Sequence, residues 1–549
     1  MEFTSEQKRI FQFVSQEKGH GIIDAVAGAG KTTTIMECAK FVKDKSTILF
    51  CAFNNSIANE IAQKFQKLGL NAVTVKTIHA LGRQILQDNN NSGQQITLEE
   101  NKYKKLLKDK EIQAKLRIHF ERILKINGFE LDGLDDRKSF AVDSLVNKIK
   151  SRLLDINSKF RATLTKEELL EFEELVIHYG IFDEIEFTKR NFKEELKEYF
   201  ECHKLLLEAG NELSKKTMVI DFTDMLYLPY KWNQQPTKKY EFLFIDECQD
   251  LSKSQFAVAA KHSKKDGRIL AVGDPSQSIY GFTGADINSF FRVKEYTKAL
   301  QLPLTTCFRC PNKVIELAQT IRKDIVGNKE DAGILDKISF DNVIKLVKPG
   351  DLIISRLRAP IVLMVFSLID KNIKVRIHED EAREIISEIK NIFKQNELNI
   401  LISTLSGEFY ELELAVKERW KWFIAKNAEL IVDRTERNLY IKNENNYLDK
   451  KIEFLHKKYE QWRYDCDTVN DIIRKIKESI SATENSIKLS TIHRAKGLEN
   501  ERVFILNYNE LPYSRLHQKD WEKTQELNLK YVAITRALEE LYLIEAKKN

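Results

Sequence analysis

The chain is poor in the residues that mark disordered, fibrous or low-complexity proteins. Only 20 of its 549 residues are glycine and 8 are proline, whereas 42% are hydrophobic and 10% are aromatic. This composition excludes the collagen-like and disordered classes, because the chain has ample apolar material for packed cores. At about 150 residues per domain, its length predicts three to four domains.

The sequence also lacks the cysteine pattern of a disulfide-rich protein and an apolar run long enough to span a membrane. The seven cysteines are scattered and odd in number, and they include a single C-x-x-C pair, Cys307 and Cys310. This pattern predicts neither a disulfide framework nor a four-cysteine metal site, and it favours the reducing cytoplasm. The longest apolar run, residues 359–369, contains Pro360 and Ser367 and is too short to cross a bilayer. We therefore expect no membrane partner.

A large excess of charge of one sign is also missing. The 88 Lys and Arg residues nearly balance the 82 Asp and Glu residues, and the formal net charge is +6. This surplus does not by itself indicate a nucleic-acid-binding protein. Residues 102–125 are locally basic, with nine Lys or Arg residues against three acids. Two interpretations stay open: the stretch lines the path of DNA, or it is an ordinary solvated helix face.

Apolar runs and helical patterns alternate near both ends of the chain. Runs such as 21–26, 47–53 and 242–245 are typical of buried strands, and helical patterns separate them. This alternation predicts parallel α/β sheets, interrupted by two long stretches of polar helical pattern. The predicted organisation is a first α/β domain at 1–82 and 217–300, its helical insertion at 83–216, a second α/β domain at 301–379 and 487–549, and its smaller helical insertion at 380–486.

A glycine-rich loop follows the first predicted strand and opens a helix. Residues 25–32 form a variant P-loop, in which Ala25 stands where the strict pattern has glycine. The loop backbone can aim N–H groups at phosphates, while Lys31 reaches the terminal phosphates and the Thr32 hydroxyl ligates Mg²⁺. The alternative is a glycine-rich turn without a ligand. The candidate ATP-binding residues are Ala27, Gly28, Ala29, Gly30, Lys31, Thr32 and Thr33.

Two acidic residues follow the apolar strand at 242–245. Asp246 is suited to hold Mg²⁺, and Glu247 is suited to position and deprotonate an attacking water. An acidic pair is equally common on a solvated surface, so the pair alone decides nothing. Together with the loop upstream it predicts ATP hydrolysis, with ATP and Mg²⁺ as ligands. Lys31, Asp246 and Glu247 are the predicted catalytic residues, and Thr32 and Asp246 form the predicted metal site.

Further motifs follow in order along the chain. Residues 246–250 and 272–281 resemble motifs of the superfamily 1A DNA helicases of the UvrD/Rep/PcrA kind. The other matches, from Gln7 to Arg536, include residues 52–55, 77–82, 221–226, 304–310, 491–499 and 531–537. The resemblance implies two RecA-like parallel-sheet domains, each with a helical insertion. It also implies single-stranded and tailed duplex DNA as substrates, with ATP-driven movement along them.

The resemblance assigns roles at the adenosine end of the nucleotide. It implies that Gln7 reads the adenine edge and that Phe308 stacks on the base. Glu499 would contact the ribose from a motif that also contains Gly497. None of these residues is singled out by composition or spacing alone.

At the phosphate end, the resemblance implies three further catalytic residues. Gln277, Arg309 and Arg536 would contact the γ-phosphate. The two arginines come from the second α/β domain, so they would act as arginine fingers on a nucleotide bound by the first. Without the resemblance they would pass for ordinary surface charges.

The resemblance also marks a track for single-stranded DNA. Such tracks combine aromatic platforms under bases with polar or basic groups along the backbone. For each aromatic residue the alternative is ordinary core packing. The candidate DNA-binding residues are Phe53, Asn55, His79, Tyr280, Phe282 and His493.

The second insertion is short and rich in aromatic residues. In relatives this position carries a mobile subdomain, and we expect a reduced version here. Its aromatic residues are expected to form a small core rather than a surface on which bases stack; they are Trp420, Trp422, Tyr459, Trp462 and Tyr464.

Three functions remain open at this point. The leading one is an ATP-dependent helicase that moves 3′ to 5′ on single-stranded DNA and unwinds duplex. The alternative is a DNA-activated ATPase that senses DNA ends or single strands and acts through a partner nuclease. A third is a P-loop ATPase unrelated to nucleic acid. Residues 53–55 and 224–229 look more like the F-box-helicase and phage-defence-associated branch than the housekeeping repair enzymes.

Overall fold

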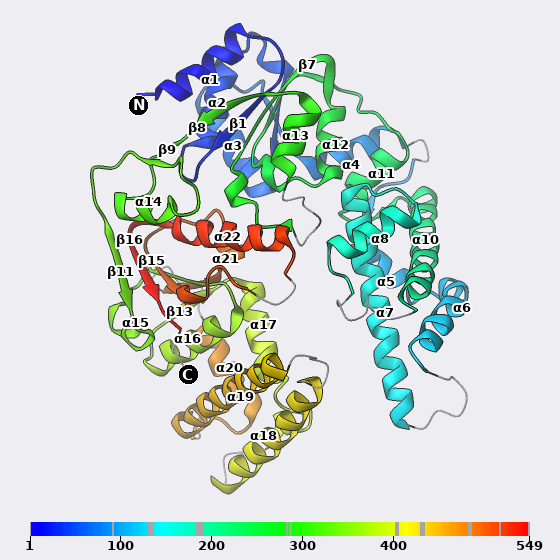
Figure 1. Ribbon diagram of the computed structural model, residues 1–549, viewed down its shortest axis with the longest axis vertical. Coiled ribbons are helices and arrows are strands. Elements are labelled where there is room, and N and C mark those ends of the chain that lie inside the picture. Colours follow the sequence, from blue (N-terminus) through cyan, green and yellow to red (C-terminus); the bar gives the residue numbers. More distant parts are fainter. Residues whose placement is uncertain are drawn as a thin grey trace. The chain divides into compact units, whose positions relative to one another are not determined.

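The computed structural model describes residues 2–90, 93–129, 136–182, 191–281, 284, 288–400, 406–428, 434–462, 464–480, 486–514 and 518–546. These residues form two compact units, Met1–Phe308 with Arg515–Asn528, and Arg309–Ser514 with Leu529–Asn549. Each unit contains a six-stranded parallel sheet flanked by helices (Figure 1). The prediction of an α/β protein with two parallel sheets is confirmed.

The first sheet has the strand order β3-β2-β6-β7-β1-β8. Its strands are short apolar runs, and all five residues of β2 are buried, as expected for a strand covered on both faces. The strands are β1 (Gly21–Ala25), β2 (Ile48–Ala52), β3 (Thr74–Thr77), β6 (Tyr240–Ile245), β7 (Ser263–Gly273) and β8 (Leu300–Leu304), and β9 (Thr306–Cys307) follows. The helices are α1 (Ser5–Gln16), α2 (Lys31–Cys38), α3 (Asn55–Lys67), α4 (Ile78–Asp88), α11 (Asp224–Lys231), α12 (Lys253–Lys261) and α13 (Ser289–Thr297).

Strand β8 extends the first sheet past the boundary that we placed between residues 300 and 301. It pairs with β1 from Gly21↔Leu300 to Ala25↔Leu304. Only Leu302 and Leu304 of β8 are buried, so the run lacks the continuous apolar character of the inner strands. Pro303 is tolerated because β8 lies at the edge of the sheet, where one side of the strand needs no ladder partner. The first unit accordingly continues to Phe308.

The first insertion is a helical bundle with its own core. Its helices are α5 (Lys102–Leu106), α6 (Lys110–Ile126), α7 (Asp136–Thr163), α8 (Leu169–His178) and α10 (Phe192–Thr217), and strands β4 (Thr97–Leu98) and β5 (Val219–Ile220) pair at its base. In the core, the ring of His203 lies 4.4 Å from that of Phe160 and 5.6 Å from that of Phe172. Burial and the charge of Arg161 lower the pKa of His203 to about 3.

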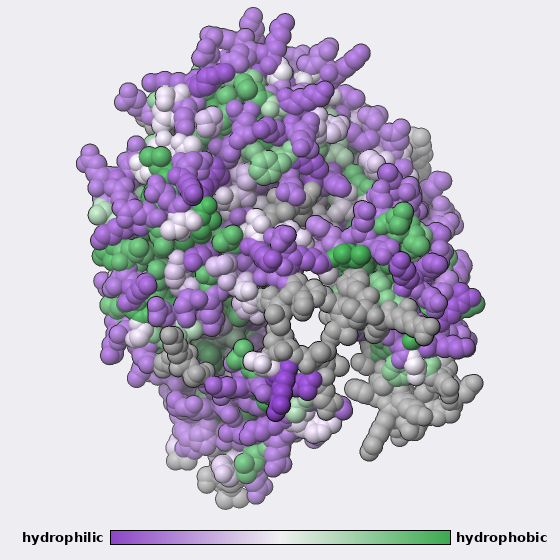
Figure 2. Space-filling model, in the orientation of Figure 1, coloured by the Kyte–Doolittle hydropathy of each residue, from purple (hydrophilic) through white to green (hydrophobic). Residues whose placement is uncertain are grey.

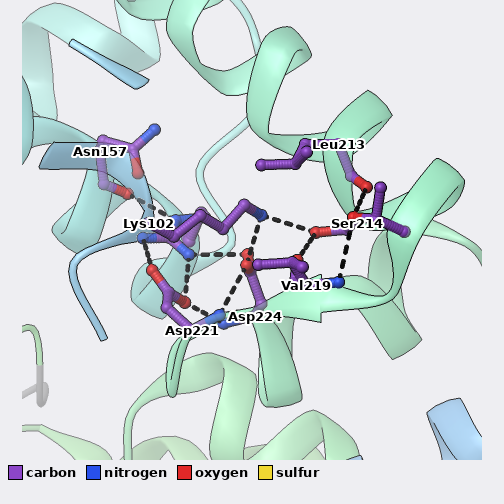
Figure 3. A network of polar contacts seen from close by, with 9 residues as sticks. Lys102, Asn157, Leu213, Ser214, Val219, Asp221 and Asp224 are labelled. Carbon is purple, nitrogen blue, oxygen red and sulfur yellow. Dashed lines mark hydrogen bonds and ion pairs between the residues drawn. The ribbon is translucent and has the colours of Figure 1, made fainter. Parts of the chain in front are cut away.

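Four buried charges join this bundle to the first α/β core (Figure 3). Arg161 of α7 holds Asp221 through two bonds of 2.7 and 2.9 Å and reaches Asp224 at 2.8 Å. Lys102 of α5 donates to Asp224 and to Ser214 of α10, each at 2.6 Å. Burial opposes ionisation of Asp221, but the charge and hydrogen bonds of Arg161 outweigh it and lower its pKa. Three insertion helices therefore meet where α11 begins.

This cluster changes the interpretation of the basic stretch at 102–125. The first of its nine basic residues, Lys102, is buried and paired with Asp224, so the hypothesis of a DNA contact is wrong for this residue. Lys115 and Arg117 form exposed ion pairs with Glu111 and Glu121 on α6. This arrangement resembles the solvated helix face of the alternative interpretation. For the exposed basic residues, contact with DNA stays a prediction.

The second sheet has the order β11-β16-β15-β12-β14-β13. Its strands are β11 (Ile334–Ile338), β12 (Leu352–Ser355), β13 (Val375–Ile377), β14 (Ile487–Thr491), β15 (Asn500–Leu506) and β16 (Ala537–Ile544), and β10 (Val326–Gly327) precedes them. Its helices are α14 (Asn312–Ala318), α15 (Phe340–Leu346), α16 (Arg358–Asp370), α21 (Ile492–Ala495) and α22 (Asp520–Ile534), of which α22 begins in the first unit.

The second insertion packs directly on the second sheet's helix α16. Its helices are α17 (Glu379–Lys390), α18 (Ser406–Ala428), α19 (Arg434–Trp462) and α20 (Val469–Ser479). Phe366 of α16 stacks on Phe454 of α19 with ring centroids 3.9 Å apart. The insertion and the sheet therefore share one hydrophobic core.

The predicted aromatic core of this insertion is confirmed only in part. Tyr459 is buried, and Trp420 and Trp462 pack against the core while partly exposed. Trp422 and Tyr464 have exposed fractions of 67% and 88%, so the prediction is wrong for these two. Aromatic content alone does not show which side of a helix faces the core.

All seven cysteines are buried. Burial raises the pKa of the Cys51 thiol to about 12. The face shown in Figure 2 is mostly hydrophilic, with hydrophobic residues in small groups. In the described parts of the chain, no helix is long and apolar enough to cross a membrane.

The buried charge cluster predicts a large effect of removing one partner. Arg161→Met leaves Asp221 and Asp224 without their main cation, and should destabilise the protein by about 3–5 kcal/mol. The matched control is Arg117→Met, because the Arg117 side chain is 79% exposed and paired with Glu121; it should cost under about 1 kcal/mol. Urea and thermal unfolding measure both changes, and similar losses in the two variants would contradict the prediction.

The lowered pKa of His203 predicts that the first insertion loses stability in acid. The folded pKa is about 3, whereas an unfolded histidine has a pKa of about 6.5, so the unfolded chain binds the extra proton between these values. Stability should therefore fall by about 2 kcal/mol between pH 7 and pH 5 through this residue. His203→Phe should flatten this part of the pH profile in thermal unfolding. A profile as steep as that of the wild type would refute the assignment.

Candidate nucleotide and DNA sites

The P-loop turns from β1 into α2 with the geometry that phosphate binding requires. Gly28 and Gly30 have φ angles of 68° and 73°, in the left-handed region that favours glycine. Gly30 is the N-cap of α2 and, having no side chain, makes no side-chain cap hydrogen bond to the first turn. Backbone N–H groups at this helix end are therefore available to an anion. Ala25, at the position of the missing glycine, is simply the buried last residue of β1.

The predicted metal ligands lie together. The Thr32 hydroxyl donates to Asp246 Oδ2 at 2.8 Å, although the two residues are far apart in sequence. Burial, followed by the charge of Glu247, raises the pKa of Asp246 to about 6. Oxygen donors of this kind fit Mg²⁺, which proteins hold through one or two carboxylates together with substrate phosphates. The described residues contain no group of three or more His, Cys, Asp or Glu that could hold a metal ion.

The adenosine-end residues of the first unit also gather at the P-loop. Gln7 caps α1 together with Thr4, and its Nε2 donates to Thr34 Oγ1 of α2 at 3.0 Å. The Phe308 backbone N–H donates to Gly28 O at 3.0 Å, and 38% of the Phe308 residue is exposed. The structure thus brings together Gln7, the phosphate loop and Phe308, as a site for a whole nucleotide requires.

A chain of hydrogen bonds runs from Glu247 to Gln277, and we call it the Gln249 chain. Gln249 Nε2 donates to Glu247 Oε2 at 2.5 Å, and the Asp274 N–H donates to Gln249 Oε1 at 3.1 Å. Gln277 Nε2 then donates to Asp274 Oδ2 at 2.7 Å. Glu247 has a φ of 52°, a left-handed conformation that costs a non-glycine residue about 1–3 kcal/mol. Strain of this kind is common at catalytic positions.

Two aromatic pairs include residues that follow the carboxyl ends of strands in the first sheet. Phe53, directly after β2, stacks on Tyr280 with ring centroids 6.3 Å apart and planes 16° apart. His79, in the first turn of α4, meets Phe222 edge-on at 6.2 Å, and burial lowers its pKa. Asn55 begins α3 and is exposed. The structure places these DNA candidates on loops and helix starts that follow parallel strands; Phe282 lies outside the described residues.

The second unit gathers the two predicted arginine fingers with Glu499. Arg309 Nη2 forms an ion pair with Glu499 Oε1 at 2.8 Å, and Arg309 Nη1 donates to Thr535 O at 3.2 Å. Arg536 is buried, and it donates from Nε to Val532 O at 2.9 Å and from Nη1 to Leu498 O at 3.1 Å. Glu499, expected at the ribose, thus pairs with Arg309 in this structure. Gly497, with a φ of 87°, forms the turn before it.

His493, the DNA candidate of the second unit, is in the short helix α21. Burial and the charge of Arg356 lower its pKa to about 4. The imidazole is therefore neutral at physiological pH, so it suits stacking or neutral hydrogen bonding better than a charge contact with phosphate.

Reasoning from the sequence missed three residues that shape these sites. Gln249 lies inside the quoted acidic motif, but nothing in the sequence shows that its amide links Glu247 to Asp274. Phe222 is 46% exposed beside His79, and the only signal in the sequence was an aromatic residue between two acids, Asp221 and Asp224. Asn528 donates to the carbonyl oxygens of Pro275 and Ser278, on either side of Gln277; we call residues 274–281 the Gln277 loop. No sequence pattern marks Asn528.

Comparison with known proteins agrees with this geometry. A family model, the UvrD/REP helicase N-terminal domain, matches residues 4–298, more than half of the chain. The chain is 23% identical to the ATP-dependent DNA helicase PcrA of Bacillus subtilis, over 97% of this chain and 82% of that protein. It is 22% identical to the ATP-dependent DNA helicase Rep of Buchnera aphidicola, over 99% of this chain and 91% of that protein.

A third relative is the probable DNA helicase II homolog of Mycoplasma capricolum, which is 24% identical over 96% of this chain and 82% of that protein. These relatives are distant, but the similarity extends along nearly the whole chain. The P-loop, the acidic pair and the Gln277 loop all lie within the stretch that the family model matches. The chain therefore belongs to the UvrD/REP helicase family, whose members are ATP-dependent DNA helicases and hence ATP hydrolases.

Proposed function

We propose that this chain is an ATP-driven translocase that moves 3′ to 5′ on single-stranded DNA and separates the strands of a tailed duplex. The direction of movement comes from the family resemblance. The observation that carries the proposal is the Gln249 chain, because it links the predicted catalytic carboxylate to the loop that bears both Gln277 and Tyr280. A change at the nucleotide can thereby reach a residue that is predicted to contact DNA.

The residues divide the chemistry among them. Thr32 and Asp246 would hold Mg²⁺, which when bound with ATP neutralises charge on the phosphates. Lys31 and the P-loop amides bind the phosphates, and Glu247 orients and deprotonates the attacking water. Gln249, which donates to Glu247 Oε2, holds that carboxylate in place.

The remaining site residues act at the two ends of the nucleotide and on DNA. Gln277, Arg309 and Arg536 would contact the γ-phosphate. Exchange of Arg309 from Glu499 to the phosphate would free Glu499 for the ribose. The stacked pair Phe53–Tyr280 supplies a platform for bases.

The alternative function is a DNA-activated ATPase that works through a partner nuclease. It uses the same nucleotide site and differs only in its output, so strand separation decides between the two. The likeness of residues 224–229 to the phage-defence-associated branch belongs to this alternative, and an adjacent nuclease gene would support it.

Replacing the catalytic carboxylate tests the leading proposal. Glu247→Gln keeps the side-chain shape but removes the base, so ATP turnover should fall by about 10²–10⁴. Unwinding of a 3′-tailed duplex should disappear while ATP still binds. Glu241→Gln is the matched control, because Glu241 is an exposed residue of β6, the strand that precedes Glu247, and is paired with Lys264. Stimulation of turnover by DNA without strand separation in the wild type would instead favour the alternative.

The metal site predicts a specific dependence on Mg²⁺. Thr32→Ala removes the hydroxyl that bonds Asp246, so the Mg²⁺ concentration for half-maximal ATPase activity should rise about tenfold or more. Thr32→Ser keeps a hydroxyl at the same position and should restore a near-normal value. A Mg²⁺ titration of ATP hydrolysis measures both variants. Equal Mg²⁺ requirements in Thr32→Ala and the wild type would show that Thr32 is not a ligand.

A further inference from the structure

Helix α22 belongs to both compact units. Its residues up to Asn528 pack with the first unit, and its residues from Leu529 onward pack with the second. The roles proposed above use only Arg536, which lies two residues beyond the end of this helix. The first part of α22 nevertheless makes several close contacts with the loop of Gln277.

Asn528 makes the most specific of these contacts. Its side chain is buried, and its Nδ2 donates to Pro275 O at 3.1 Å and to Ser278 O at 2.9 Å. A primary amide carries two hydrogens, and both are used here. The two accepting carbonyls flank Gln277 on either side. Ser278 has a second tie, because its Oγ donates to Gln249 O at 3.2 Å.

Neighbouring residues of α22 extend the contact. A Cβ atom added at Gly281 would lie 2.8 Å from Gln525 Oε1 and 3.1 Å from the Trp521 ring, so α22 packs closely against the loop at this glycine. Trp521 also donates from Nε1 to His178 O at 3.0 Å and stacks on the His178 ring at 5.4 Å. The same face of α22 therefore contacts the Gln277 loop and the end of α8 in the first insertion.

We propose that Asn528 is a positioning residue that sets the rate of ATP turnover through Gln277. By holding the carbonyls on both sides of Gln277, it fixes the turn that directs the Gln277 side chain toward Asp274. This inference rests on the proposed function, in which Gln277 contacts the γ-phosphate. In this role Asn528 acts through the backbone of the loop.

The continuity of α22 gives this contact a wider role. The helix runs without a break from Asp520 to Ile534, and the Arg536 guanidinium is bonded back to Val532 O in its last turn. Gln277 and Arg536, which are predicted to contact the same phosphate, are thus attached to one helix.

The isosteric variant Asn528→Asp tests the proposal. Aspartate keeps the shape but cannot donate, and its oxygens would face two carbonyl oxygens. We expect kcat for DNA-stimulated ATP hydrolysis to fall about tenfold, with KM for ATP and the affinity for single-stranded DNA within about twofold. The double variant Gln277→Ala/Asn528→Asp should be no slower than Gln277→Ala alone, because Asn528 acts through Gln277. Losses that multiply would overturn the proposal.

A second measurement does not depend on activity. Amide hydrogen exchange at Gln277 and Ser278 should become about tenfold faster in Asn528→Asp without nucleotide, because the loop loses its outer support. Unchanged exchange would overturn the positioning role. A normal ATPase in Gln277→Ala would instead contradict the proposed role of Gln277 and leave the exchange result to decide the role of Asn528.

Two further variants control for folding. Asn342→Asp makes the same substitution at an exposed position on α15, and it should leave kcat, exchange and thermal stability unchanged. Asn528→Ala removes both donors without adding a charge. It should reproduce the loss of kcat and the faster exchange even if Asn528→Asp proves unstable, and wild-type values in Asn528→Ala would refute the proposal.

Discussion

Parallel strand pairing is the constraint on which the arrangement of the first unit depends. In a parallel sheet every strand ends at the same edge, so residues that follow different strands are brought together there. Five of the six strands of the first sheet end in a candidate site residue or loop; these are the P-loop after β1, Phe53 after β2, His79 after β3, Asp246 after β6 and Asp274 after β7. The nucleotide and DNA candidates of the first unit therefore lie together at the carboxyl ends of the strands, because all strands of the sheet run in one direction.

The buried charges between the first insertion and α11 fix the orientation of that insertion. A helical bundle placed between two strands of a sheet must keep a defined orientation, and hydrophobic contacts alone are not directional. Arg161 and Lys102 meet Asp221 and Asp224 with short, specific bonds at the start of α11. Phe222, next to His79, lies between these two acids. The orientation of the insertion and the position of an exposed aromatic residue thus depend on the same ion pairs.

The fold was predictable from the sequence largely because buried parallel strands are continuous apolar runs. Strand β8 escaped prediction because an edge strand is only half buried and tolerates Pro303. The P-loop and the acidic pair were predictable from local chemistry, whereas Arg309 and Arg536 required a family resemblance. Lys102 was misassigned because composition does not distinguish a buried cation from a solvated one. Asn528 could not be predicted, because its partners are backbone oxygens about 250 residues away in the chain.

The buried cysteines have a practical consequence for studying motion in this molecule. Thiol-reactive dyes and spin labels need an accessible thiolate, and burial at all seven native positions withholds it. A cysteine introduced at an exposed position of each unit would therefore be labelled with little reaction at the native cysteines, which need not be removed from the cores. Pairs of such labels would give distances between the two units during a catalytic cycle. Because the native thiols are packed in the cores, spectroscopic labels can be placed selectively at chosen surface positions.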